Sequence, residues 1–188
     1  MMKNWIYALG VAGILCTASG CATLGIGTDG TPADTGTGTG TPSTKQADQA
    51  FVSSAASSGQ LEVRLSEVAV QKAVTIEVRE FSRLMVQHHT KANSELQGLA
   101  RQHGLTFSTT LQADHQAIYE RVSKLTGAAF EKAYASEMEA AHRQDVVLYQ
   151  AASSGVTLNT PLRGFALKTL PVLQGHLRLA TQLKNVLN

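Results

Sequence analysis

The stretch Phe81–Leu96, FSRLMVQHHTKANSEL, decides the fold that we predict for this chain. Residues three and four apart share one face of a helix, and around this stretch one face collects apolar side chains and a single histidine. That face consists of Val78, Phe81, Met85, His89, Ala92, Leu96 and Leu99. The pattern therefore predicts a long amphipathic helix with a titratable imidazole in the middle of its apolar face.

The helical period continues from residue 46 onward, and no sustained alternation of polar and apolar residues indicates a strand. Gly104 suits a left-handed C-cap, Ser108 or Thr109 an N-cap, and Thr160-Pro161 the start of a last helix. We expect helices at about 48–72, 75–103, 110–124, 128–153 and 160–186. Four long helices, with a short one between the second and third, predict an all-α, up-and-down four-helix bundle.

Pro171 lies inside the last expected helix, where a proline removes a hydrogen bond and clashes with the preceding turn. We expect a kink about one turn before His176. The kink either follows the curvature of the bundle or turns His176 inward, and the sequence leaves both interpretations open.

Residues 1–20 are typical of an export signal. Lys3 precedes the apolar run Trp5–Cys16, which is shorter than the ~20 residues of a permanent membrane span. The sequence Ala18-Ser19-Gly20-Cys21 resembles a bacterial lipobox, although Ala18 stands where Leu is commonest. We expect a lipid anchor on Cys21, with cleavage of a soluble periplasmic protein as the alternative.

The residue after the cysteine is Ala22, and in the sorting pattern of such lipoproteins this favours the outer membrane, facing the periplasm. Residues 21–46 are rich in Gly, Thr, Pro, Ser and Asp, which predicts a disordered tether before a domain over 47–188. The chain has 188 residues and a net charge of +2, with scattered Lys and Arg, so we expect no nucleic-acid partner. The membrane, reached through the lipid on Cys21, is the one partner that the sequence indicates.

The other long helices each place one polar residue on an otherwise apolar face, namely Glu62, His142 and His176. With His89, each long helix contributes one such residue. A buried carboxylate or imidazole is costly unless it is paired, hydrogen-bonded or bound to a metal. One Glu and three His in a bundle core suit one transition-metal ion, such as Zn, Fe or Cu, and these four residues form our hypothetical metal site.

Two other interpretations compete with a single-metal site. A structural network in which Glu62 accepts from the imidazoles stays open. A di-iron ferroxidase is disfavoured, because it needs Glu-x-x-His on two helices and only Glu139-Ala140-Ala141-His142 fits, while Val86 and Leu173 stand in the corresponding places. We expect His88 at the edge of its helical face, in contact with solvent.

Several blocks of the sequence together resemble one known family. They are Leu61-Glu62-Val63; Met85–His89 with Asn93 and Glu95-Leu96; Phe130–Tyr134 with His142; and Leu170-Pro171 with His176-Leu177. The chain is similar, over about 51–181, to an exported bacterial ferritin-like family of unknown function (domain of unknown function four-one-four-two, putative outer membrane protein). The resemblance implies a ferritin-like bundle and no established activity. Two positions depart from the family pattern, since His88 and Glu131 stand where Asp is usual.

The sequence names no reaction, and no motif for a nucleophile, a zinc protease or a phosphate loop is present. Our leading interpretation is a lipid-anchored envelope protein with a structural or stress-related role, more a non-enzyme than an enzyme. The alternative is a transition-metal-binding or redox protein that acts on small oxidants.

Overall fold

The computed structural model describes residues 44–188, and all regular structure within them is helical. The helices are α1 (Thr44–Lys72), α2 (Ile76–Gln102), α3 (Ala113–Ser123), α4 (Gly127–Ser154) and α5 (Thr160–Leu187). The prediction of an all-α bundle is confirmed, and α1 begins inside the stretch assigned to the tether. The predicted export signal, the lipobox with Cys21 and most of the tether lie outside the described residues. None of the helices between 44 and 188 is long and apolar enough to cross a membrane.

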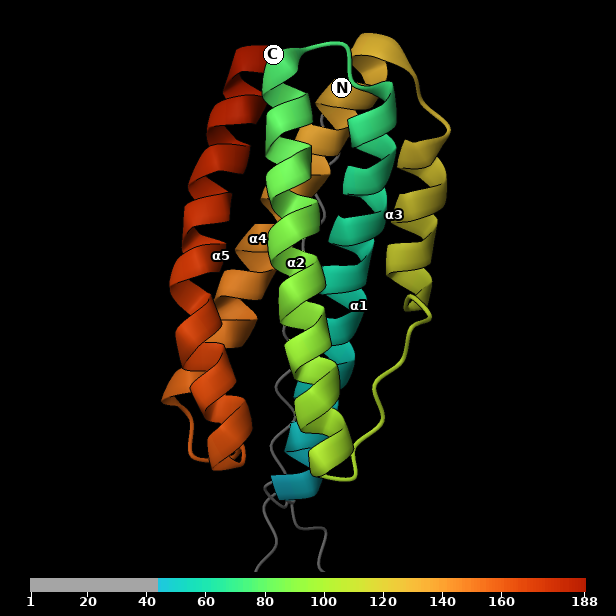
Figure 1. Ribbon diagram of the computed structural model, residues 1–188. Helices are drawn as coiled ribbons and strands as arrows, with labels where there is room; N and C mark the ends of the chain where they lie inside the picture. Colours follow the sequence, from blue (N-terminus) through green and yellow to red (C-terminus); the bar gives the residue numbers. More distant parts are fainter. Residues whose placement is uncertain (1–43) are drawn as a thin grey trace, which may run out of the picture. The chain divides into compact units, whose positions relative to one another are not determined.

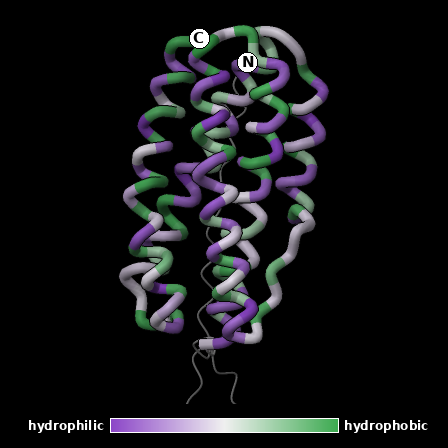
Figure 2. Tube along the Cα trace, viewed as in Figure 1, coloured by the Kyte–Doolittle hydropathy of each residue, from purple (hydrophilic) through white to green (hydrophobic). Residues whose placement is uncertain are grey.

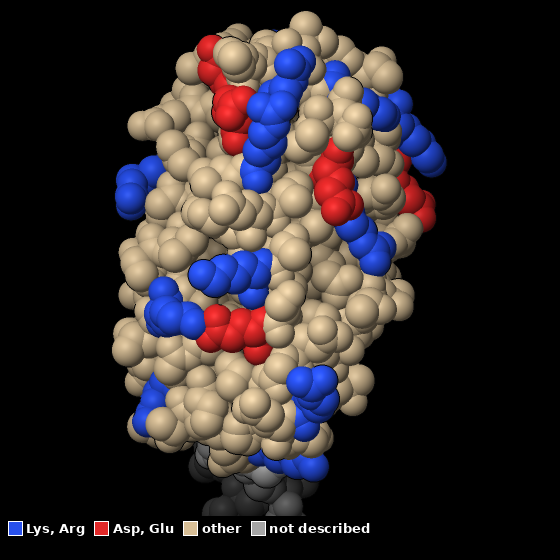
Figure 3. Space-filling view, viewed as in Figure 1, with Lys and Arg blue, Asp and Glu red and all other residues tan. Residues whose placement is uncertain are grey.

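The four long helices lie side by side, and α3 runs along the outside of the bundle against α1 and α4 (Figure 1). The most extensive packing joins α1 to α2 and α4 to α5. Each helix alternates polar and apolar stretches along its length, as its amphipathic pattern requires (Figure 2). On the face drawn in Figure 3, acidic and basic side chains are dispersed among uncharged ones, and several lie beside a group of opposite sign.

The expected up-and-down order is wrong at one connection. The starts of α2 and α4 lie at the same end of the bundle, because Glu131 in α4 accepts hydrogen bonds from the backbone N–H groups of Val74 and Thr75, at 2.8 and 2.7 Å. At the other end, Asp48 near the start of α1 accepts from the backbone N–H of Asn159 at 2.9 Å. Helices α2 and α4 are therefore parallel, and the connection 103–126 carries the chain back along the bundle (Figure 1).

Hydrogen bonds from α1 hold this long connection in place. The side chains of Gln60 and Arg64 donate to the backbone carbonyls of Ser108 and Thr109, at 2.5 and 2.7 Å. The Ser108 hydroxyl accepts from the N–H of Thr110 at 3.0 Å, which makes a local turn. That hydroxyl is engaged in the turn and does not cap a helix. The N-cap of α3 is Gln112, where Ser108 or Thr109 was expected, and the helix begins at Ala113.

The ends of the long helices follow ordinary capping chemistry. Gly104 has a φ of 63°, as expected for the residue that ends α2. The N-cap of α5 is Asn159 and not Thr160, because the Asn159 side chain accepts from the N–H of Leu162 at 3.0 Å. Helix α5 stays helical through Pro171, which lies on its exposed side.

The core consists of two apolar clusters, one toward each end of the bundle. The first includes Leu65, Met85, Phe130 and Ala180, and the second includes Phe51, Leu96, Leu162 and Phe165. Buried polar residues separate the two clusters, and they come from all four long helices. The fold therefore places a polar layer in the middle of an apolar core.

Candidate metal centre

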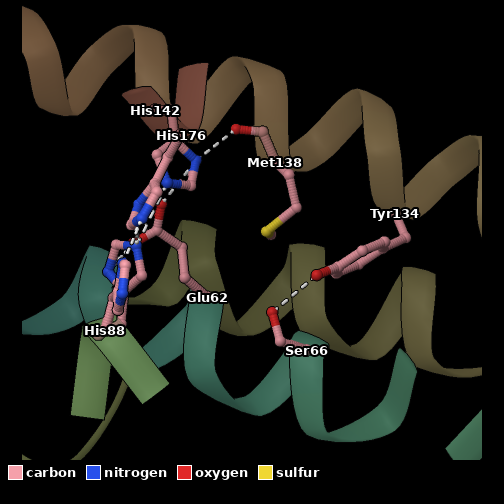
Figure 4. A network of polar contacts seen from close by, with 8 residues as sticks. Glu62, Ser66, His88, Tyr134, Met138, His142 and His176 are labelled. Carbon is pink, nitrogen blue, oxygen red and sulfur yellow. Dashed lines mark hydrogen bonds and ion pairs between the residues drawn. The ribbon is translucent and has the colours of Figure 1, made fainter. Parts of the chain in front are cut away.

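The structure buries all four residues of the predicted site. Glu62 and His142 are fully buried, and His89 and His176 are 4% and 3% exposed. They come from α1, α4, α2 and α5 respectively, because each lies among apolar residues at helical spacing. Close packing of the bundle then brings the four side chains together, and Figure 4 shows Glu62, His142 and His176 close to one another.

Three of the four residues converge on one point. His89 Nε2 lies 3.2 Å from His142 Nε2 and 3.2 Å from His176 Nδ1. The ring centroids are 5.2 Å apart in all three pairs, so the imidazoles form a nearly equilateral triangle. One nitrogen of each ring therefore faces the same small space, which is the arrangement that a metal ion requires.

Glu62 lies on the other side of two of these rings. Its carboxylate oxygens are 2.9 Å from His89 Nδ1 and 3.2 Å from His142 Nδ1, which are the nitrogens that face away from the common point. The structure thus places Glu62 where it can orient the two imidazoles, whereas the sequence predicted it as a fourth ligand. Carboxylates in this position fix the ring tautomer of metal-binding histidines.

The outer nitrogens of His142 and His176 have further partners. His142 Nδ1 donates to the backbone carbonyl of Met138 at 2.8 Å. His176 Nε2 lies 2.9 Å from His88 Nδ1, and the two rings are stacked at 5.1 Å. His88 was expected at the edge of its helical face in contact with solvent; it is half-buried, and its contact with His176 also joins it to the cluster. Figure 4 shows the rings of His88, His142 and His176 beside the Glu62 side chain.

These contacts decide which nitrogens carry protons. A carbonyl and a carboxylate only accept, so His142 and His89 hold their protons on Nδ1 and direct the lone pairs of Nε2 at the common point. A proton from His176 Nδ1 can satisfy His89 Nε2. When all three rings are neutral, no proton is then left for His142 Nε2, and its lone pair faces that of His89 Nε2 at 3.2 Å. A cation at the common point removes this repulsion.

Electrostatics disfavour an extra proton on His142 and on His176. Burial, opposed in part by the Glu62 carboxylate, lowers the pKa of His142, and burial together with the neighbouring His89 lowers the pKa of His176 to about 3. Burial acts to raise the pKa of Glu62, but the neighbouring histidines outweigh it and lower that pKa to about 2. Glu62 is therefore an ionised carboxylate in the core, and a buried carboxylate of this kind requires a positive charge nearby.

The donor set fits one first-row metal ion. Metal–nitrogen distances of 2.0–2.1 Å in a tetrahedral site separate the nitrogens by roughly 3.3–3.4 Å, close to the distances between the imidazole nitrogens. A di-iron site does not fit, because the carboxylate of Glu139 instead pairs with Lys184 at 2.6 Å and Arg143 at 2.7 Å. Among residues 44–188, Glu62 is the one carboxylate in contact with the cluster.

Sequence reasoning also missed Asp145 and Tyr149, one and two turns after His142 in α4. Both are buried and line a small cavity that adjoins His89 and His176. Their spacing of three and seven residues from His142 places them on the same face of the helix, and that signal was available in the sequence.

A comparison with known families identifies the chain. The model of a family described as "Domain of unknown function (DUF4142)" matches residues 33–183, so the chain belongs to this family and the predicted resemblance is confirmed. No curated protein and no solved structure matches the chain. The description of the family assigns no activity, so the function has to be argued from the site.

Proposed function

We propose that this protein binds one transition-metal ion in the core of its bundle, through His89 Nε2, His142 Nε2 and His176 Nδ1. The observation that carries the proposal is the 3.2 Å separation of His89 Nε2 and His142 Nε2, with the outer nitrogen of each ring beside an acceptor. Imidazole nitrogens suit Zn, Cu, Fe and Ni. The three histidines supply the ligands, and Glu62, His88 and the Met138 carbonyl hold their rings in place.

Metal analysis of the domain tests this proposal directly. We expect about one equivalent of Zn²⁺ or Cu²⁺ after reconstitution, and a melting temperature that rises with metal, because the ion binds only the assembled bundle. His89→Ala should lose both effects. The matched control is His103→Ala, which removes an exposed histidine at the C-cap of α2.

Chelator and pH provide a second test of the same site. Affinity should fall as the pH drops through the histidine range, because metal and protons compete for the same lone pairs. If the cluster is a structural network, metal and chelator leave the melting temperature unchanged. His89→Ala then costs about 1–3 kcal/mol of stability through unsatisfied partners. That outcome would favour a structural role in the envelope over metal binding.

We further propose that the bundle is of the ferritin-like type. Its support is the single long connection between α2 and α4, since ferritin-like folds differ from simple up-and-down bundles by one such crossover. An experimental structure in which α2 and α4 run antiparallel would contradict this assignment.

We also propose that lipid on Cys21 attaches the protein to the outer membrane, where it faces the periplasm. The support is the lipobox-like sequence before Cys21, together with Ala22 after it. Labelled palmitate should be incorporated by the full chain and by the control Cys16→Ser, but not by Cys21→Ser. Incorporation into Cys21→Ser would exclude this anchor.

A further inference from the structure

A cavity of about 20 Å³ adjoins two of the proposed metal ligands. His89 and His176 form part of its wall, and Asn93, Asp145 and Tyr149 form another part. A space of this size holds a water-sized molecule. Three histidines leave one position of a four-coordinate ion for a further ligand, and open positions of this kind distinguish reactive sites from closed structural ones.

Two polar groups on the cavity wall have no partner within the described part of the chain. The ring of Tyr149 packs against Phe51 and Phe165 at 5.3 and 5.9 Å, and the side chain is only 5% exposed. No hydrogen bond from residues 44–188 reaches its hydroxyl or the amide of Asn93. Both groups can therefore donate a hydrogen bond to a molecule in the cavity.

The backbone of α1 makes room for one of these groups. A Cβ atom on Gly59 would lie 2.3 Å from Asn93 Oδ1. Glycine inside a helix costs about 1 kcal/mol relative to alanine, so its place here requires a reason. That reason is the Asn93 amide, which lies against α1 at the edge of the cavity.

Burial raises the pKa of two groups on this wall. Burial, with the charge of Glu62, raises the pKa of Asp145 well above its usual value, and burial with Asp145 and Glu62 does the same for Tyr149. The cavity wall therefore presents O–H and N–H donors beside the cationic position. Such a combination selects a ligand that carries negative charge and accepts hydrogen bonds.

A wider cavity of about 310 Å³ lies outside the first, between α2 and α5. The two share His88, Ala92, Thr169 and Val172 in their walls. Lys91 and Lys168 line the outer cavity, and Lys168 pairs with Glu95 across its mouth. Glu95 neutralises Lys168, and Lys91 leaves the mouth with a net positive charge, which favours the entry of anions.

We propose that the inner cavity binds one end of a small anion of up to three atoms, which takes the open position on the metal, accepts hydrogen bonds from Tyr149 and Asn93 and extends toward the outer cavity. The inference rests on the proposed metal site and specifies the class of molecule that the site receives. The outer cavity between α2 and α5 is the route by which the anion arrives.

Azide is the probe for this site, and the Cu²⁺-loaded domain is the protein to use. Azide should produce a saturable change in the visible absorption of the bound copper. Tyr149→Phe should weaken azide binding roughly tenfold, because one hydrogen bond to a charged ligand is lost. Ala92→Leu fills both cavities and should abolish the change, while copper content stays at one equivalent.

The control is Ser94→Leu, which adds a similar bulk on the exposed side of α2 and should bind azide like the wild type. Copper binding without any azide response would overturn the anion site and leave the metal site standing. An azide response that Tyr149→Phe and Ala92→Leu both preserve would also overturn it, because the anion would then bind elsewhere. Failure to bind copper or zinc at all would overturn the proposed function, and this inference with it.

Discussion

Glu131 and Glu62 are both buried glutamates of this bundle, 3% and 0% exposed, but different groups face them. One oxygen of Glu131 accepts from the backbone N–H groups of Val74 and Thr75 and from the Thr75 hydroxyl, at 2.7–3.1 Å. Glu62 faces imidazole rings, and no backbone N–H within residues 44–188 donates to either of its oxygens. The outer ring nitrogens of His89 and His142 lie 2.9 and 3.2 Å from these oxygens.

The difference separates a structural carboxylate from one that serves a site. Glu131 caps the start of α2 and is satisfied by backbone donors that only the folded chain brings together. Glu62 depends on the protonation and charge of its neighbours, which a bound metal ion would change. The fold therefore needs Glu131 whether or not metal is present, whereas the role of Glu62 depends on the metal.

The largest effect on stability should come from the structural carboxylate. Glu131→Ala removes three hydrogen bonds at the start of α2 and should lower the free energy of unfolding by about 2–3 kcal/mol. The loss should be the same with metal and with chelator, as measured by urea denaturation. Glu137→Ala in the same helix breaks an exposed pair with Arg121 and should cost less than about 1 kcal/mol. A loss of stability in Glu131→Ala that differed between metal and chelator would contradict the contrast between Glu131 and Glu62.

The second effect, a fall in metal affinity, should come from a change at Glu62. Glu62→Gln keeps the shape of the side chain but removes the charge that orients His89 and His142, so metal affinity should fall about 10–100-fold. Competition with a chelator of known affinity measures the change, and Glu131→Gln should bind metal like the wild type. Complete loss of metal from Glu62→Gln, as from His89→Ala, would instead make Glu62 a direct ligand, as the sequence predicted.

The sequence predicted the helices and the buried positions well for a physical reason. Apolar residues at helical spacing define the inner face of each helix, so they placed Glu62, His89, His142 and His176 inside the core. Their burial at one level follows from helix lengths and packing. The same spacing carries no information on which nitrogen of each ring points inward. It therefore could not distinguish Glu62 as a ligand from Glu62 as a partner of the outer nitrogens.

The direction of α4 and the role of His88 escaped prediction for a different reason. The path of the long connection depends on hydrogen bonds from Gln60 and Arg64 to backbone carbonyls, which any residue at positions 108 and 109 can supply. His88 lies one residue away from the inner face of α2, and only the approach of His176 from α5 brings it into the cluster. Both features depend on contacts between distant segments, and no local pattern encodes them.

The smallest effect should come from the buried hydroxyl pair of Ser66 and Tyr134, which lies one turn further along α1 than Glu62. The hydroxyls of Ser66 and Tyr134 are 2.8 Å apart, and burial raises the pKa of Tyr134, so the pair is neutral and complete in itself. Tyr134→Phe keeps the ring stacked on Phe130 and should cost about 1 kcal/mol, the value of one buried hydrogen bond.

The double variant Ser66→Ala with Tyr134→Phe should cost less than the sum of the two single changes, because neither partner is left unsatisfied. Metal affinity should stay unchanged in all three variants. A fall in affinity comparable to that of Glu62→Gln would show that the polar layer acts as one unit, and it would remove the distinction between structural and metal-dependent groups on which the comparison rests.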